Sequence, residues 1–173
     1  MNPDHADPHA VLLATLRRIG SLDTADADAI TKLPMRVTPK RNGAIVVQNG
    51  NTITECAVLL DGYACRHKIA SNGGRQIVSF HMPGDILDLQ HLWLPRADHT
   101  VELISRATVA FVPVDVLRSL CEARPASHSA MAHFAYRRVD LPRMGTKCRS
   151  PRCEDPSCAY AMRVRDPAYS GWP

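Results

Sequence analysis

The pattern of apolar and polar positions divides the chain into helical ends and a middle of short strands. Apolar residues recur at helical spacing over 9–19, and Ser21, Leu22 and Asp23 can cap a second helix that continues to Leu33. From residue 35 to residue 112 the apolar segments are short, rich in β-branched residues and separated by Gly, Asn, Asp or Pro. The expected strands are 35–37, 43–47, 52–60, 62–69, 75–82, 85–89, 101–105 and 108–112. This pattern predicts an α+β fold that is mainly β, a jelly roll or barrel with flanking helices.

A β-hairpin lies at the centre of this prediction. The loop 70–74 contains Asn72, Gly73 and Gly74, which supply the positive φ values needed to reverse the chain between the arms 62–69 and 75–82. We expect one face of the hairpin to be buried and to hold Tyr63, Cys65, Ile69, Val78, Phe80 and Met82. The face toward solvent is then expected to hold Arg66, Lys68, Ser79 and His81. The Pro-Gly-Asp sequence at 83–85 ends the ladder, because proline has no N–H to donate.

Helical spacing returns at Val114, and after Arg124 and Pro125 a further helix is expected over 126–141. Its apolar stripe consists of Met131, Phe134, Ala135, Val139 and Leu141. Beyond Leu141 the composition changes, because the segment 142–173 holds 5 of the 13 prolines and 3 of the 6 cysteines but only one residue, Val164, from the set Val, Ile, Leu and Phe. Such a segment cannot build a core, and we expect it to be disordered or loosely attached.

Charge and cysteine content narrow the class of protein. The formal net charge is +4, but residues 1–136 contain 13 Lys and Arg against 13 Asp and Glu, so the basic excess belongs to the last 37 residues. Cys56, Cys65 and Cys121 fall within apolar segments, which indicates reduced, buried thiols. No run approaches 18 apolar residues and the start of the chain is polar. We therefore expect a cytoplasmic protein without membrane contact.

The order of these elements resembles the Crp/Fnr family of bacterial transcription regulators over residues 12–141. The resemblance is carried by the run Gly-Arg-Gln-Ile-Val-Ser-Phe-x-x-Pro-Gly-Asp at 74–85 and by Val-Ala-Phe-Val-Pro at 109–113, which leads into a helix. It implies a cyclic nucleotide-binding-like β-roll with N-terminal helices over 1–122 and a dimerisation helix over 123–141, which is truncated here. The family's winged helix-turn-helix has no counterpart in 142–173, so we expect no DNA-binding residues and interpret that tail as out of frame after a frameshift or early stop.

The resemblance also implies a ligand pocket after the Pro-Gly-Asp turn. Its family positions are Gly84, Asp85, Asp88, Leu89, Asp98, His99 and Thr100. Nucleotide-binding members use a Gly-Glu pair and an Arg-Ser pair there, because a buried phosphate needs N–H donors and a cation. This chain has Asp88-Leu89 and Asp98-His99-Thr100 instead, although Arg96 or His99 could substitute for the missing cation. We expect an unknown small effector rather than cyclic AMP or cyclic GMP.

Other kinds of site find little support in the sequence. Cys148, Cys153 and Cys158 supply only three thiols for zinc, although His128 or His133 could complete the set in principle, and the remaining cysteines are too dispersed for an iron–sulfur cluster. We interpret Asp88, His91, Asp98 and His99 as scattered polar loop residues, and we expect no metal, no cofactor and no catalytic residue.

Three hypotheses remain open at this stage. The first is the sensory and dimerisation part of a Crp/Fnr-type regulator without its own DNA-binding domain, forming a homodimer or a heterodimer with full-length paralogues. The second is a free-standing module that acts through protein partners. The third is a small cupin-type β-roll enzyme, which would need a His-x-His pair, whereas His81 is followed by Met82 and Pro83.

Overall fold

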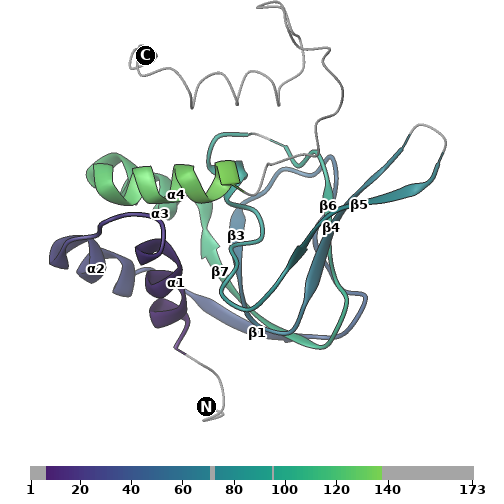
Figure 1. Ribbon diagram of the computed structural model, residues 1–173, viewed down its shortest axis with the longest axis horizontal. Helices are drawn as coiled ribbons and strands as arrows, with labels where there is room; N and C mark the ends of the chain where they lie inside the picture. The colour runs from purple at the N-terminus through teal and green to yellow at the C-terminus, as the bar shows by residue number, and fades with distance from the viewer. Residues whose placement is uncertain (1–6, 71–72, 95, 138–173) are drawn as a thin grey trace, which may run out of the picture.

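The computed structural model describes residues 7–70, 73–94 and 96–137. The helices are α1 (Pro8–Arg17), α2 (Thr24–Thr31), the 3-10 helix η1 (Leu89–Leu92), α3 (Val114–Ala123) and α4 (Pro125–Arg137). The strands are β1 (Arg36–Lys40), β2 (Ile45–Val47), β3 (Glu55–Asp61), β4 (Ala64–Ile69), β5 (Arg75–His81), β6 (Thr100–Leu103) and β7 (Ala107–Pro113). Helices gather on one side of the strands, and the β4–β5 hairpin projects on the other side (Figure 1).

Two antiparallel sheets form the roll. One has the strand order β1-β7-β3 and the other the order β2-β6-β4-β5. The pairing of β1 with β7 and of β2 with β6 joins segments that are far apart in sequence, which is what closes the roll. The predicted mainly β fold with flanking helices is confirmed.

The three-stranded sheet separates two hydrophobic cores. Along β3, Cys56 and Val58 face a core shared with the helices, whereas Ala57 and Leu59 face a second core between the sheets. Side chains of a strand alternate between its two faces, so a strand covered on both faces must be apolar throughout. This explains why β3 is buried over almost its whole length.

The helices pack as one group on the outer face of that sheet. Asp23 and Asp26 form a capping box at the start of α2, as the sequence predicts for the Ser-Leu-Asp segment. The hydroxyl of Ser127 on α4 donates to Oδ1 of Asp26 over 3.1 Å, and both residues are buried. Gly20 lies against Ala130, where an added Cβ would come within 3.2 Å of the alanine methyl group. The start of α4 therefore belongs to the same packed unit as α1 and α2.

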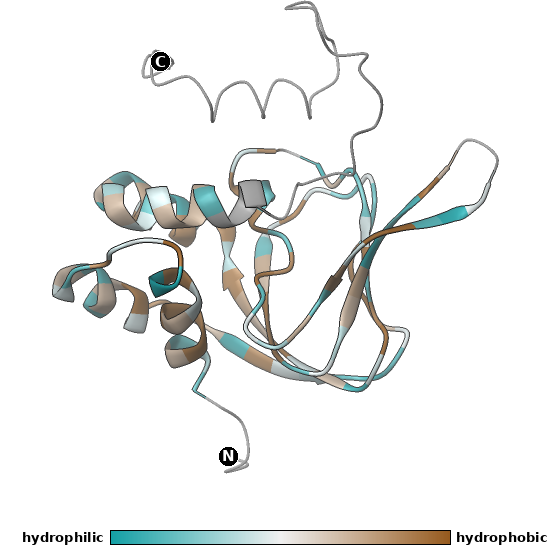
Figure 2. Cartoon of the chain, viewed as in Figure 1, coloured by the Kyte–Doolittle hydropathy of each residue, from teal (hydrophilic) through white to brown (hydrophobic). Residues whose placement is uncertain are grey.

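The hairpin exists as predicted and Cys65 is buried as expected, but the assignment of most of the other residues to the buried and exposed faces is wrong. Residues expected to be buried are exposed by about half or more of their surface: Tyr63, Ile69, Phe80 and Met82 at 54%, 61%, 61% and 59%. Arg66 and His81, expected to face solvent, are buried. Figure 2 shows apolar residues on both arms of this projecting hairpin.

The reason for this reversal lies in the position of β4 within its sheet. Arg66 pairs with Val101 of β6, whose side chain belongs to the core between the sheets, so Arg66 faces the interior of the roll. Cys65 pairs with Phe80 and faces outward, where the guanidinium of Arg75 covers it at 3.0 Å. A bulge at Val78 then separates the pair Arg66 and Ser79 from the pair His67 and Ile77. Alternation alone does not reveal which face of a ribbon is turned inward.

The expected strand 85–89 is also wrong. Only Ile86 makes an isolated bridge, to Val58, and η1 follows at Leu89. The predicted thiols are confirmed in part, because Cys56 and Cys65 are buried and free while Cys121 is half-buried. Within the described ranges, no helix is long and apolar enough to cross a membrane.

Candidate functional site

The candidate site begins at the Pro-Gly-Asp turn, where the chain leaves β5. Gly84 has a φ of +92°, a conformation that glycine adopts without strain. Its carbonyl oxygen accepts a hydrogen bond of 2.6 Å from the hydroxyl of Thr15 on α1. The carboxylate of Asp85 accepts from the backbone N–H of Met82 at 2.9 Å, which closes the turn on itself. These contacts fix the direction in which the chain enters the roll toward η1.

Arg66 reaches from β4 to the segment after the turn. Its guanidinium donates to the carbonyl oxygen of Leu87 at 2.8 Å and to Oε1 of Gln90 at 3.2 Å. The side chain is 6% exposed, so these hydrogen bonds lie in a poorly solvated interior. The guanidinium of Arg66 thus fills the space between β4 and η1.

A second group of polar contacts surrounds Asp98, in the loop before β6. Oδ2 of Asp98 lies 2.7 Å from Nζ of Lys68 on β4, and Oδ1 lies 2.6 Å from Nδ1 of His99. The amide of Gln90 donates to the same Oδ1 at 3.2 Å. Asp98 therefore holds β4, η1 and its own loop together through a single carboxylate.

Asp88 lies between two buried histidines. Its Oδ1 is in ion-pair contact with Nδ1 of His91 and lies 3.5 Å from Nε2 of His99. All three side chains are at most 1% exposed. Five of their polar atoms have no hydrogen-bond partner among the described residues: both carboxylate oxygens of Asp88, both ring nitrogens of His91, and Nε2 of His99. Buried polar atoms without a hydrogen bond are rare, so these five call for an explanation.

Burial and hydrogen bonding shift the acid–base properties of these groups in opposite directions. The hydrogen bond from His99 holds the pKa of the Asp98 carboxyl well below its usual range, against the effect of burial. Burial lowers the pKa of His99 below its ordinary value of 6.5, although the hydrogen bond to Asp98 acts against this. Burial, aided by the nearby Asp88 carboxylate, raises the pKa of the Cys56 thiol. At neutral pH the arrangement favours an ionised Asp98 beside a neutral His99.

The short helix η1 also contacts the helical side of the molecule. Arg118 on α3 donates to the carbonyl oxygens of His91 and Leu92, at 3.2 Å and 2.9 Å. The ring of Trp93, directly after η1, lies with its centroid 5.9 Å from that of His128 on α4. A change in the polar interior near η1 therefore acts on residues that contact α3 and α4 directly.

The structure brings together residues that the sequence analysis treated as scattered. Asp88, His91, Asp98 and His99 form one connected cluster, so their interpretation as independent loop residues is wrong. The other pocket positions have structural roles: Leu89 packs in the helical core, and the Thr100 hydroxyl accepts from the backbone N–H of Asn49 at 3.3 Å. The sequence analysis missed the participation of Arg66, Lys68 and Gln90. Arg66 and Lys68 lie on the same face of β4, so the alternation along the strand could have identified both once the inward face was known.

Of the predicted dimerisation stripe, only Met131 has a described side chain. Met131 is fully buried in its own chain, with its sulfur 3.6 Å from that of Cys121. The side chains of Phe134 and Ala135, and the residues Val139 and Leu141, lie outside what the structure describes, as do Cys148, Cys153 and Cys158. Met131 therefore contributes to the monomer core, and the dimerisation helix stays a prediction.

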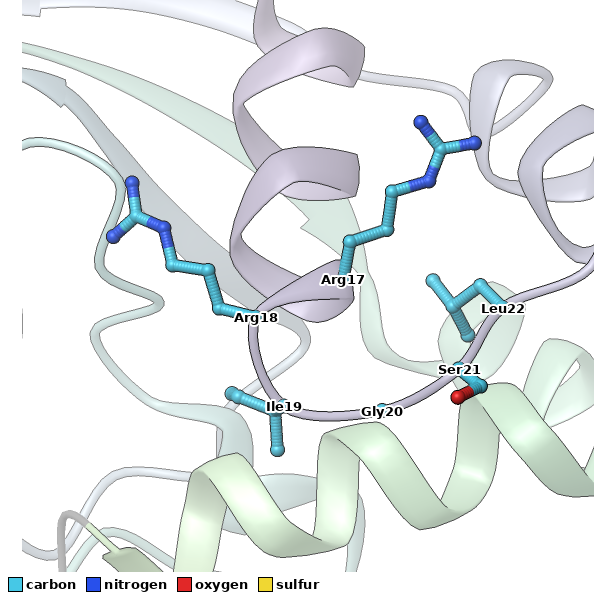
Figure 3. Close-up of a pocket in the computed structure, with 6 residues that line it drawn as sticks. All are labelled: Arg17, Arg18, Ile19, Gly20, Ser21 and Leu22. Atoms are coloured by element: carbon cyan, nitrogen blue, oxygen red, sulfur yellow. The ribbon is translucent and has the colours of Figure 1, made fainter.

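A further hollow, of about 460 Å³, lies at the loop between α1 and α2 and is lined by Arg17–Leu22. The side chains of Arg17 and Arg18 point to opposite sides of α1, so their charges do not converge on one ligand (Figure 3). Among the residues that the structure describes, no group of three or more His, Cys, Asp or Glu is arranged to hold a metal ion.

Part of the chain matches a known protein family. Residues 39–124 match the sequence profile of the family described as "Cyclic nucleotide-binding domain". The "Anaerobic regulatory protein" of Haemophilus influenzae is 22% identical over 105 residues, which are 61% of this chain and 41% of that protein. This chain spans less than half the length of the curated relatives that it matches.

Solved structures show the same fold. The cyclic nucleotide-binding domain from Methylobacillus flagellatus superposes with a TM-score of 0.64 at 13% identity, covering 76% of this chain and 75% of that one. The sensor domain of the transcriptional regulator DNR from Pseudomonas aeruginosa gives a TM-score of 0.60 at 14% identity, covering 80% of this chain and 95% of the sensor domain. At these identities the likeness establishes the architecture of the roll and its flanking helices.

Proposed function

The chain contains a cyclic nucleotide-binding domain and is a homologue of the Crp/Fnr regulators, and from this premise we propose that it is the sensory module of a transcription regulator in which polar and charged side chains around η1 already pair with one another. Such a module has no catalytic task. Its role is to change conformation when the state of its interior changes, and to pass that change to the helices that follow the roll.

The observation that carries the proposal is the network joining Arg66, Lys68, Asp98 and Gln90. In this network each protein cation already has a protein partner: Arg66 donates to Leu87 and Gln90, and Lys68 pairs with Asp98. A cyclic nucleotide brings a phosphate that needs donors and a cation, and an ionised Asp98 in the same space would repel it. We therefore infer that cyclic AMP and cyclic GMP are not the effectors.

Isothermal titration of the purified chain with cyclic AMP and cyclic GMP tests this inference. The expected result is no saturable heat up to millimolar nucleotide, with a cyclic-AMP-binding regulatory domain run as a positive control. Micromolar affinity for either nucleotide would overturn the inference. The matched variant Asp98→Asn removes the repelling charge, and a gain of weak nucleotide binding in this variant would identify Asp98 as the barrier.

Dimerisation through the helix 123–141, as a homodimer or with full-length paralogues, belongs to the same proposal. Contact with operator DNA is proposed for the assembled regulator rather than for residues of this chain. Sedimentation velocity at several concentrations measures the first point, and co-purification of a longer paralogue with the tagged chain measures the second. A monomer at all concentrations that also co-purifies with no paralogue would contradict dimerisation.

The exposed apolar face of the hairpin favours a second candidate, a module that acts through a protein partner. Ile69, Ile77 and Phe80 are 61%, 48% and 61% exposed and come from paired strands. Exposed apolar patches of this kind mark contact surfaces in soluble proteins. If Phe80→Ser abolishes binding to a co-purifying protein but leaves the helices intact, the partner role is supported.

A further inference from the structure

The strongest unexplained feature of the interior is the group formed by Asp88, His91 and His99. It is withdrawn from solvent, and five of its polar atoms make no hydrogen bond within the described part of the chain, although Oδ1 of Asp88 is in ion-pair contact with both histidines. We propose that these three residues form a buried proton-binding site, and that the module senses pH through it. The inference deepens the proposed sensory function by naming the effector, and it rests on that function only for its biological use.

The hydrogen bonding of His99 shows where the proton would be taken up. Asp98 is ionised and can only accept, so its short contact of 2.6 Å assigns the hydrogen to Nδ1 of His99. The amide of Gln90, 3.0 Å from the same Nδ1, then donates to Oδ1 of Asp98 instead. In the neutral ring Nε2 is then an acceptor, and it faces Oδ1 of Asp88, another acceptor, at 3.5 Å. One added proton at Nε2 converts this acceptor–acceptor contact into a charged donor–acceptor pair.

Burial is the main factor that opposes the added proton at His99, because it lowers the pKa of the ring. Toward His99 face Asp88 and Asp98, which favour protonation, and Arg66 of β4, which opposes it. His91 shares Asp88 as its partner, and its ring centroid lies 5.9 Å from that of His99. Lys68 of β4 neutralises Asp98, Arg118 of α3 holds the carbonyl oxygen of His91, and the Cys56 thiol of β3 stays protonated beside Asp88. Protonation of His99 would add one more positive charge to a dry interior in which Arg66, Lys68 and Arg118 already outnumber the two carboxylates.

The position of the site lets protonation affect the rest of the molecule. His91 belongs to η1, whose backbone is held by Arg118 of α3 and whose following residue, Trp93, contacts His128 of α4. An excess charge near η1 is relieved by letting water in, which requires η1 to move away from β4. Because α3 and α4 contact η1 directly, they would move with it.

The acid–base linkage predicts the direction of the effect. Burial lowers the pKa of His99 in the folded chain, so the unfolded chain binds the proton more readily. The stabilisation of the neutral, closed state is complete above the ordinary histidine pKa of 6.5 and is lost as the pH falls below it. For one proton, the unfolding equilibrium constant is expected to rise about 10-fold for each pH unit between 6.5 and the lowered pKa of the folded state.

The test is a urea unfolding series between pH 5 and pH 8 on the full chain, without nucleotide. In the unmodified protein we expect the pH dependence of the unfolding free energy to correspond to one bound proton. In His99→Gln this dependence should be abolished or halved. It should persist in the matched control His133→Gln, whose side chain is exposed. Equal slopes in the unmodified chain and His99→Gln would overturn the proposal, whatever the nucleotide titration shows.

Histidine ring NMR of the unmodified protein keeps the test decisive if the variants fail to fold. A buried ring that titrates below 6.5, together with shifted signals from Trp93, is expected. The absence of any buried titrating ring between pH 5 and 8 would refute the site. The last test is native mass spectrometry before and after dialysis against EDTA. A divalent ion bound to Asp88, His91 and His99 would mean that these side chains are metal ligands and not a proton-binding site.

Discussion

Arg66 on β4 and Gln90 on η1 are joined by a hydrogen bond of 3.2 Å across the interior of the roll. The same guanidinium donates to the carbonyl oxygen of Leu87, so a single side chain bridges the sheet and the segment that carries Asp88. Both residues are buried. The position of η1 therefore depends on a cation supplied from a strand rather than on apolar packing alone.

Replacing Arg66 with Met tests this dependence. The substitution keeps most of the side-chain volume but leaves buried acceptors without donors, and we expect a loss of about 2–4 kcal/mol in the free energy of unfolding. Arg36→Met is the matched control, because Arg36 pairs with Glu55 at the surface, and an exposed ion pair contributes about 1 kcal/mol or less. Urea denaturation at constant pH measures both, and equal losses would show that Arg66 has no special role.

Two glycines with similar backbone angles should respond differently to alanine. Gly43 has a φ of +78° and open space around it, so Gly43→Ala should cost about 1–2 kcal/mol from the unfavourable backbone alone. At Gly62, with a φ of +87°, an added Cβ would lie 2.7 Å from the Cβ of Ala107 and closer still to the carbonyl oxygen of Arg106. The crowding should add about 1–3 kcal/mol. Chemical denaturation of the two variants distinguishes strain from crowding, and equal costs would contradict the packing described at Gly62.

The exposed face of the hairpin should influence association more than stability. Phe80→Ser removes an apolar ring that is 61% exposed, so the free energy of unfolding should change by about 1 kcal/mol or less. Association at high protein concentration, measured by light scattering, should fall. Val109→Ser is the contrasting variant, because Val109 is fully buried and its replacement should cost about 2 kcal/mol or more. If Phe80→Ser leaves association unchanged, the apolar face is not a contact surface.

The thiol of Cys121 should be slow to react at neutral pH. Burial raises its pKa to about 11 from an ordinary 9.0, which reduces the thiolate fraction at pH 7.5 by about 100-fold. Alkylation should accelerate as the pH rises toward 11, because the thiolate is the reacting form. The measurement uses iodoacetamide and mass spectrometry on a chain in which Cys148, Cys153 and Cys158 are replaced by Ser. Rapid labelling of Cys121 at pH 7 would contradict the packing against Met131.

The sequence was informative where local chemistry decides the structure and less so where tertiary contacts decide it. The capping residue Asp23, the turn at Gly73 and the short apolar strands follow from local preferences, and their elements are confirmed. The burial of Arg66 does not, because alternation along β4 identifies two faces but not which one lies inside the roll. The cluster of Asp88 and His99 joins residues eleven positions apart through the loop before β6, and no local pattern records that approach.

The hydrogen bond between Ser127 and Asp26 and the close contact of Gly20 with Ala130 have a mechanical consequence. They join the first turns of α4 to α2 and to the loop that precedes α2, so a rotation of α4 alone about Pro125 would break both contacts. A displacement that begins near η1 would instead move α2 and α4 together as one rigid unit. The amplitude of any signal at Arg137 would then be set by how far this block tilts, and not by bending within the helix.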